Sequence, residues 1–251
     1  VRAGKSAGIP TGIHDLDCAT GGWRQKDLIV LAARPGMGKT AMMLKFAQGA
    51  AMAGKAVCMY SLEMGSESLA NRMMYSLCNV DAEQYKKGTP SSQDWIEMSN
   101  AAFELNKLPI YIDPNPTVTM RYIRSNSRVM SKKGKCDIIM IDYLQLVDVS
   151  STDRNSNREQ RIADASRTAK IIAKEVNVPV ILLCQMNRKA EDRAGKEPEL
   201  ADLRESGAIE QDADMVMFVF RPEYYGMLED TKGNSLKGVG KLMIRKFREG
   251  A

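Results

Sequence analysis

One segment near the start of the chain restricts the fold more than any other. A short apolar run over 28–32 leads directly into Ala33-Arg34-Pro35-Gly36-Met37-Gly38-Lys39-Thr40, and helical periodicity follows over 39–53. A strand, a glycine-rich turn and a helix start in immediate succession are typical of the Walker A phosphate-binding loop. The glycines let backbone amides turn inward toward a phosphate chain, and the helix adds its positive N-terminal end.

The residue types in this loop predict separate roles. Lys39 is expected to contact the β and γ phosphates of a nucleotide, and Thr40 a magnesium ion. Ala33 stands at the first position of the motif, where glycine is usual, and an ordinary glycine-rich turn is the alternative interpretation. The residues expected to surround the nucleotide are Arg34, Pro35, Gly36, Met37, Gly38, Lys39, Thr40 and Ala41.

The rest of the chain alternates between apolar runs and amphipathic stretches, which predicts a mostly parallel α/β sheet. Further strands are expected at 57–61, 110–112, 137–141, 180–183, 215–220 and 242–247. Helices are expected at 39–53, 66–78, 91–106, 119–132 and 158–177. The runs at 138–141, 180–183 and 215–220 are apolar on both alternating faces, which favours strands at the centre of the sheet.

Composition fits this class and excludes others. With 44% hydrophobic and 27% charged residues among 251, the chain resembles an ordinary globular protein, and no apolar run approaches the roughly 20 residues of a membrane span. The single histidine, His14, excludes multi-histidine metal sites, and the net charge of +5 permits a polyanionic partner. Reduced core thiols are expected at Cys18, Cys58, Cys78, Cys136 and Cys184.

Three strand ends carry side chains suited to nucleotide hydrolysis. Asp142 ends an apolar strand, as in the Walker B pattern, and is expected to hold the magnesium ion or its water. Glu63 follows the strand at 57–61 and is expected to orient the attacking water if it faces the γ phosphate, although composition alone favours a solvated loop acid. Gln185 is expected to hydrogen-bond the γ phosphate, with an ordinary loop amide as the alternative.

Several strings occur together in the order of one known family. They are the Walker A segment, Thr11-Gly12-Ile13, Asp15-Leu16-Asp17, Ser61-Leu62-Glu63-Met64, Ile141-Asp142-Tyr143-Leu144-Gln145-Leu146, Gln185-Met186-Asn187-Arg188, residues 202–214 and Lys246-Phe247-Arg248. In these strings the chain resembles the C-terminal RecA-like motor domain of DnaB-type replicative DNA helicases. The resemblance implies a RecA-like P-loop NTPase fold over 11–251, with helices on both faces of a twisted sheet. Residues 1–10 are expected to be residual linker, and the family's N-terminal helical domain to be absent.

The resemblance also implies an activity and its partners. A homo-hexameric ring would hydrolyse ATP with Mg²⁺ at subunit interfaces, translocate on single-stranded DNA and unwind duplex, in the cytoplasm of a bacterial or phage-infected cell. Primase and a helicase loader would join through the full-length protein, and no membrane is involved. Arg248 matches the family's arginine finger and Lys246 its companion, both acting on the neighbouring subunit's nucleotide. Without the resemblance these two residues belong to a basic edge strand.

DNA contacts are implied at two places. Arg204, Glu205 and Gly207 match a loop that follows the DNA backbone, and Arg158 and Arg161 follow a second central loop at 150–157. A helix start without a ligand is the alternative for the first place. A further basic face recurs at helical spacing, where a solvated surface is favoured over DNA contact. It consists of Arg121, Arg124, Arg128 and Lys132.

The chain departs from the family at two positions, and two other functions compete with that of a helicase. Lys26 stands where the family usually has glycine, and Glu249 where it often has asparagine. One competing function is a RecA-like filament-forming recombinase or single-stranded-DNA-dependent ATPase, which would form open helical filaments in place of closed rings. A nucleotide-gated scaffold with weak turnover is disfavoured because Glu63 and Gln185 are both present.

Overall fold

The predicted alternation of strands and helices is present in the computed structural model, which describes residues 8–78, 80, 91–115, 117–142, 158–186 and 196–248. The strands are β1 (Leu28–Ala33), β2 (Val57–Ser61), β3 (Ile110–Asp113), β4 (Ile138–Asp142), β5 (Val180–Gln185), β6 (Met215–Phe220) and β7 (Lys241–Phe247). The helices are α1 (His14–Thr20), α2 (Lys39–Met52), α3 (Ser66–Leu77), α5 (Ser92–Lys107), α6 (Met120–Lys132), α7 (Arg158–Val176) and α8 (Gly207–Asp212), with short 3₁₀ turns η3 (Leu200–Ser206) and η4 (Pro222–Tyr225).

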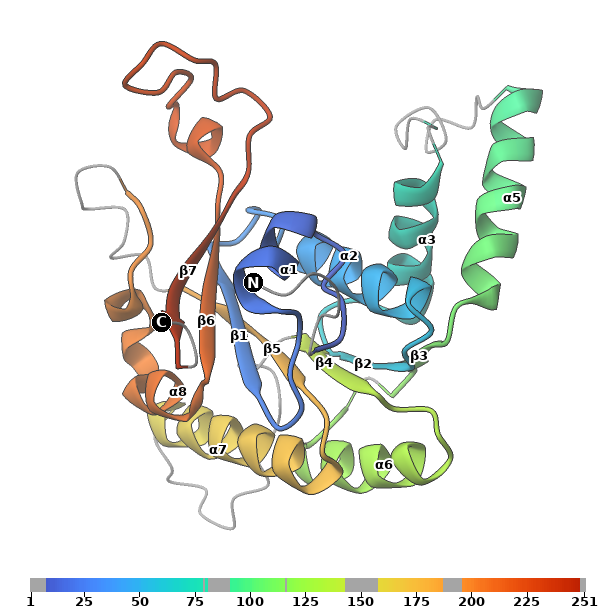
Figure 1. The fold of residues 1–251 in the computed structure, drawn as a ribbon, viewed down its shortest axis with the longest axis vertical. Helices are drawn as coiled ribbons and strands as arrows, with labels where there is room; N and C mark the ends of the chain where they lie inside the picture. The colour runs from blue at the N-terminus through green and yellow to red at the C-terminus, as the bar shows by residue number, and fades with distance from the viewer. Residues whose placement is uncertain are drawn as a thin grey trace.

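The strands form one sheet in the order β3-β2-β4-β5-β1-β6-β7 (Figure 1). All pairs are parallel except β6 with β7. The predicted central position is confirmed for β4 and β5 but wrong for β6, because β1 lies between β5 and β6. Every residue of β6 is nevertheless buried, since its side chains enter the apolar layers on both faces of the sheet and β7 pairs with its outer edge. The apolarity of that run therefore reflected burial and not its place in the strand order.

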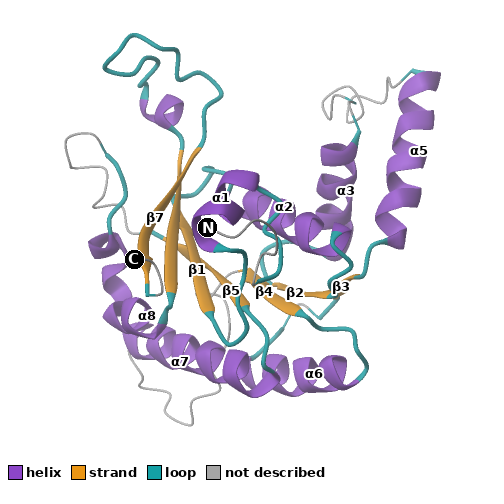
Figure 2. Ribbon diagram, viewed as in Figure 1, coloured by secondary structure: helices purple, strands orange, loops and turns teal. Residues whose placement is uncertain are grey.

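Side chains that alternate along the strands enter two separate apolar layers, and Figure 2 shows the helices that flank the sheet. In one layer Val30 and Leu182 pack with residues of α6, α7 and α8. In the other, Leu31 and Leu183 pack with residues of α1, α2 and α3. Helices thus cover both faces of the sheet, as predicted.

Local capping accounts for where several helices begin and end. The Ser91 hydroxyl accepts a hydrogen bond from the Asp94 amide at 3.1 Å, and the Asp94 carboxylate accepts one from the Ser91 amide at 2.7 Å. This capping box starts α5 as predicted. Gly54 and Gly134, which follow α2 and α6, adopt positive φ angles of 74° and 67°. The seven-residue α1 was not predicted, because so short a helix gives little periodic signal.

The prediction of reduced core thiols has a mixed outcome. Cys58, Cys136 and Cys184 are buried free thiols, as predicted, but Cys18 is exposed and Cys78 is only partly buried. The core assignment is wrong for these last two because they lie on the short α1 and at the end of α3. Among the described residues, no helix is both long and apolar enough to cross a membrane.

The segment before β1 packs closely on the helix that follows the phosphate loop. The Thr11 amide donates to the Asp17 carboxylate at 2.8 Å, which holds the segment in place. Gly12 has a φ of 82° and lies directly against Gly49 of α2. A β-carbon on Gly49 would lie 2.3 Å from the Gly12 Cα atom, so only glycine fits there.

Gly49→Ala is therefore expected to lower the free energy of unfolding by about 1 to 3 kcal/mol, because the added methyl overlaps backbone that cannot move freely. Chemical denaturation measures the change. Gly65→Ala is the control, since Gly65 has a φ of −65° and a β-carbon there would have no atom within 4 Å. Equal stability of the two variants would contradict the close packing of Gly12 on Gly49.

The predicted basic face on α6 is partly engaged within the fold. Arg124 Nε donates to Glu175 Oε2 at 2.8 Å, and Arg128 Nη2 donates to the same oxygen at 2.7 Å. Glu175 belongs to α7, so the two ion pairs join neighbouring helices. The hydrogen bond from Arg124, with a smaller contribution from Arg128, holds the pKa of Glu175 at about 2.

Because this pKa lies below the ordinary value of 4.5, the ion pairs stabilise the fold above that pH and lose their effect as the pH falls toward 2. Glu175→Gln is expected to lower the thermal unfolding midpoint at pH 7, with the difference from wild type narrowing below pH 4.5. The control is Glu104→Gln, which removes an exposed pair with Lys107 within α5. A constant difference between Glu175→Gln and wild type at every pH would rule out the ion-pair explanation.

Candidate active site

Four adjacent parallel strands bring the predicted catalytic residues to one edge of the sheet. The carboxyl ends of β2, β4, β5 and β1 meet there, the usual ligand-binding edge of such a sheet. Ala33 pairs with Gln185, and Ser61 pairs with Asp142. The phosphate loop follows β1, and Glu63 lies two residues beyond the end of β2. Residues far apart in sequence therefore converge because of strand order.

A pocket of about 380 Å³ lies at this edge. It brings together Lys39, Thr40, Glu63 and Gln185, four of the residues to which the sequence analysis assigns a role in hydrolysis. Met37 is the exception within the loop, because its side chain is 2% exposed and packs in the core, which leaves only its backbone for a ligand. The full lining is Ala33, Arg34, Pro35, Gly36, Gly38, Lys39, Thr40, Ala41, Glu63, Met64, Arg72 and Gln185.

The loop has the backbone conformation that phosphate binding needs. Gly36 and Gly38 have φ angles of 78° and 91°, which residues with a β-carbon rarely adopt. A β-carbon on Gly38 would meet no atom within 4 Å, so conformation and not space requires glycine there. Gly38 also caps α2 without any side-chain hydrogen bond. The N-terminal end of a helix capped in this way attracts anionic ligands through its amides and its positive dipole end.

Asp142 lies beneath the loop and is fully buried. The Thr40 hydroxyl donates to Asp142 Oδ2 at 2.9 Å, and Lys39 Nζ lies 3.4 Å from Oδ1. The Lys39 contact is an ion pair without hydrogen-bond geometry, and Oδ1 has no hydrogen-bond partner. A buried carboxylate oxygen left in this way, beside a threonine hydroxyl, fits a magnesium ion, which prefers oxygen ligands.

The turn that carries Glu63 is held by its neighbours. The Leu62 amide donates to the Asp142 carbonyl at 2.8 Å, and the Ser61 hydroxyl donates to the Met64 carbonyl at 2.8 Å. These bonds leave Glu63 exposed at the wall of the pocket. A carboxylate in this position can accept a proton from a water molecule beside a bound phosphate.

Arg72 is a pocket residue that sequence reasoning missed. It lies on α3 and lines the same pocket as Lys39 and Glu63. The helical turn that carries Arg72 faces the pocket because α3 packs on α2. At this contact Gln48 Nε2 of α2 donates to the Met73 carbonyl of α3 at 3.0 Å. Nothing in the local sequence distinguishes Arg72 from another exposed helix arginine, so only the packing of the two helices identifies it.

Lys246 and Arg248 lie at the other edge of the sheet. Strand β7 runs antiparallel to β6, and Phe247 pairs with Met215, the first residue of β6. Arg248 therefore lies beyond the amino end of β6, roughly 20 Å along a six-residue strand from the edge that carries the pocket. Neither cation lines the pocket of its own chain in the part that the structure describes.

The elements with the predicted DNA contacts are neighbours. Helix α7, which begins at Arg158 and carries the exposed Arg161, contacts both η3 and α8. Arg204 and Glu205 belong to η3, and Gly207 begins α8. The side chains of Arg158, Arg204 and Glu205 lie outside the described part, as do the loop at 150–157 and Glu249. DNA contact therefore stays a prediction.

Lys26, which stands where the family usually has glycine, has an unusual backbone conformation. Lys26 has a φ of 69°, in the left-handed region that favours glycine. Its carbonyl accepts a hydrogen bond from Lys170 Nζ at 2.8 Å. A glycine at this position in other chains would adopt the same turn with less strain.

Comparison with known proteins agrees with this geometry. A family model described as "DnaB-like helicase C terminal domain" matches residues 8–251. "Replicative DNA helicase DnaC" of Bacillus subtilis (strain 168) is 40% identical over 250 residues, which cover 99% of this chain and 54% of the relative. "Replicative DNA helicase DnaB" of Geobacillus stearothermophilus is 39% identical with the same coverage. The chain thus spans about half the length of these curated relatives.

Solved structures lead to the same family. One solved ATPase domain superposes with a TM-score of 0.91 at 36% identity, covering 99% of this chain and 86% of that chain. "The Structure Of A DnaB-Like Replicative Helicase And Its Interactions With Primase" also gives a TM-score of 0.91 at 36% identity, covering 99% of this chain and 58% of that chain. The chain belongs to the family of DnaB-like helicase C-terminal domains, and its sheet has their RecA-like fold.

Proposed function

We propose that this chain is the ATP-hydrolysing motor of a replicative DNA helicase, active at the subunit interfaces of a hexameric ring that moves along single-stranded DNA. The observation that carries the proposal is one pocket that holds Lys39, Thr40, Glu63 and Gln185 above the buried Asp142. The names of its relatives, replicative DNA helicases, support the same activity. The primase named with one related structure supports primase as a partner of the whole protein, in the cytoplasm where replication takes place.

Binding of the triphosphate rests on the loop and α2. The amides around Gly36 and Gly38 and the first turn of α2 surround the phosphates, and Lys39 places a positive charge beside the β and γ groups. Thr40 and Asp142 are the residues that would hold Mg²⁺, which neutralises charge that develops on the phosphate oxygens. Asp142 Oδ1, which accepts no hydrogen bond, supports that role.

Hydrolysis then needs an oriented water molecule. Glu63 accepts a hydrogen bond, and finally a proton, from a water that attacks the γ phosphorus in line with the leaving β–γ bridging oxygen. Gln185, at the end of β5, lines the same pocket, and in this proposal it contacts the γ phosphate and registers its release. Arg72 adds a cation on the α3 side of the same pocket.

Completion of the site requires a second subunit. A loose phosphoryl-transfer transition state carries spread negative charge that an additional arginine stabilises. Arg248 and Lys246 lie at the edge of the sheet away from their own pocket, so in this proposal they serve the nucleotide of a neighbour. Hydrolysis would thereby depend on contact between subunits.

Glu63→Gln is expected to lower the ATP turnover rate by about 10²- to 10⁴-fold, because the amide cannot accept the proton of the attacking water. Binding of a fluorescent ATP analogue should change little, since Lys39 and the loop remain. Glu67→Gln is the matched control, four residues on and on the exposed side of α3. Near-normal turnover in Glu63→Gln, with and without single-stranded DNA, would remove Glu63 from the mechanism.

Complementation tests the action of Arg248 across an interface. Lys39→Ala subunits cannot hold the triphosphate properly but can donate a finger, whereas Arg248→Ala subunits do the reverse. Each variant alone is expected to lose DNA-stimulated turnover by about 10³-fold or more. An equal mixture should recover part of the wild-type turnover, because some interfaces then join an intact pocket to an intact finger. No recovery in mixtures that assemble normally would contradict action in trans.

A further inference from the structure

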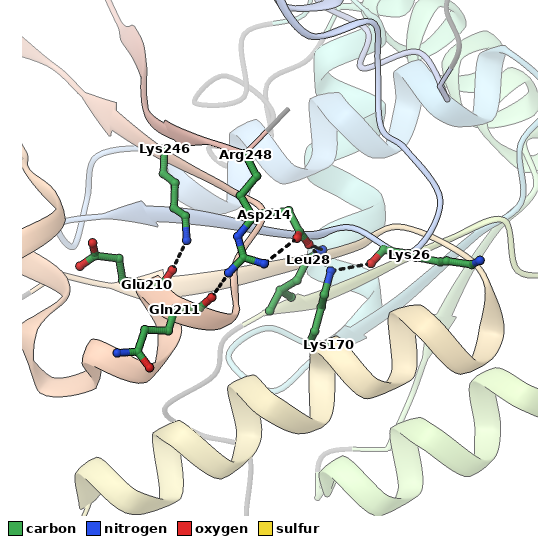
Figure 3. A network of polar contacts seen from close by, with 8 residues as sticks. All are labelled: Lys26, Leu28, Lys170, Glu210, Gln211, Asp214, Lys246 and Arg248. Atoms are coloured by element: carbon green, nitrogen blue, oxygen red, sulfur yellow. Dashed lines mark hydrogen bonds and ion pairs between the residues drawn. The ribbon is translucent and has the colours of Figure 1, made fainter. Parts of the chain in front are cut away.

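The two cations proposed to act across the interface are held on their own subunit by the end of α8 (Figure 3). Lys246 Nζ donates to the Glu210 carbonyl, and Arg248 Nη2 donates to the Gln211 carbonyl. Arg248 Nη1 also lies 3.3 Å from Asp214 Oδ1. Both carbonyls belong to the last turn of α8, where helix carbonyls have no partner within the helix.

The carboxylate that meets Arg248 is itself fixed from other sides. Asp214 Oδ2 accepts the Leu28 amide at 2.7 Å and also pairs with Lys170 Nζ of α7. Its backbone bonds to both neighbouring strands, with the Asp214 amide donating to the Leu28 carbonyl and the Arg248 amide donating to the Asp214 carbonyl, each at 2.9 Å. The Asp214 side chain is only 13% exposed. It therefore offers Arg248 a rigid acceptor.

The contrast in exposure indicates what this arrangement does. The Arg248 side chain is 48% exposed, so its guanidinium can reach a partner, yet its acceptors on Asp214 and α8 restrict its rotamers. A long exposed side chain ordinarily loses much conformational entropy when it acts in one geometry, and holding it beforehand removes that cost. Burial and the neighbouring charge of Arg248 lower the pKa of Lys246, whereas Glu210, Asp214 and Asp212 oppose that effect.

We propose that Asp214 is a positioning residue for the arginine finger: with the Gln211 carbonyl it holds Arg248 in the orientation from which it reaches the neighbouring nucleotide. The inference rests on the proposed function of Arg248. Helix α8 begins at Gly207, beside the segment expected to contact DNA, so the helix that would sense DNA also ends at the finger. A displacement of α8 would move the Glu210 and Gln211 carbonyls and with them both cations.

The test uses the mixture of Lys39→Ala and Arg248→Ala subunits, and adds Asp214→Asn to one or the other of them. Asparagine keeps the shape and an oxygen for the Leu28 amide but removes the charge that Arg248 meets. In the finger-donating Lys39→Ala subunit it is expected to lower recovered turnover by about tenfold, the loss of one charge-assisted hydrogen bond that positions an acting group. In the receiving Arg248→Ala subunit, whose finger is absent, most of the recovery should persist.

Two further variants separate positioning from folding. Asp212→Asn removes a carboxylate at the end of α8. Among the described contacts Asp212 makes no ion pair with Lys170 or Arg248, so this variant should not lower the recovered turnover. Lys170→Met removes the ion pair between α7 and Asp214. It should change the recovered turnover equally in the finger-donating and the receiving subunit. Thermal unfolding of every variant and native mass spectrometry of every mixture report folding and assembly.

The outcomes distinguish this inference from the proposed function. If Asp214→Asn lowers the recovered turnover only when it is in the finger-donating Lys39→Ala subunit, Asp214 is supported as a positioning residue. Equal loss in both subunits, including loss through misfolding, overturns it and leaves Asp214 as a structural link between β1 and α7. No recovery in the mixture of Lys39→Ala with Arg248→Ala overturns action of the finger in trans, and the role of Asp214 with it.

Discussion

The active site depends on one buried charge. Asp142 is fully buried at the end of β4, where an uncompensated carboxylate would be costly. Thr40 and Lys39, the first residues of α2, lie against it and tie the phosphate loop to the neighbouring part of the sheet. One oxygen is left without a hydrogen bond. The same contacts that hold the loop in shape thus involve the carboxylate proposed to hold Mg²⁺.

The sheet also separates two kinds of chemistry. The candidate nucleotide pocket lies at its carboxyl edge, and Lys246 and Arg248 lie at its amino edge, where the antiparallel β7 ends. Because the strands are stiff and paired along their length, the two sets cannot meet within one chain. In the proposed function this separation makes assembly necessary, since each subunit would hold half of two different sites. Asp214, placed where β1, α7 and β7 meet, makes the amino edge a defined surface.

Much of this could be predicted from the sequence, and the failures have physical causes. Lys39 and Thr40 were identified as residues of a phosphate-binding loop because the strand, the glycines and the helix start that form it are consecutive in the chain. Arg72 was missed because its place in the pocket follows from the packing of α3 on α2. The central position expected of β6 was wrong because an apolar run indicates burial on both faces of the sheet, and β6 has that burial although it lies next to the edge strand β7. The DNA contacts remain predictions.

By itself, the sequence determined the local features, which are the phosphate loop, the capped helices and the apolar strands. Short motifs in a characteristic order also identified the family. These depend on residues close together in the chain, whose backbone preferences and periodicity need no partner. Only the tertiary structure decided which distant groups meet: Asp142 with Thr40, and Arg248 with Asp214 and the end of α8. Such contacts follow from strand order and helix packing, which bring together residues as far apart as Thr40 and Asp142, 102 positions away in the chain.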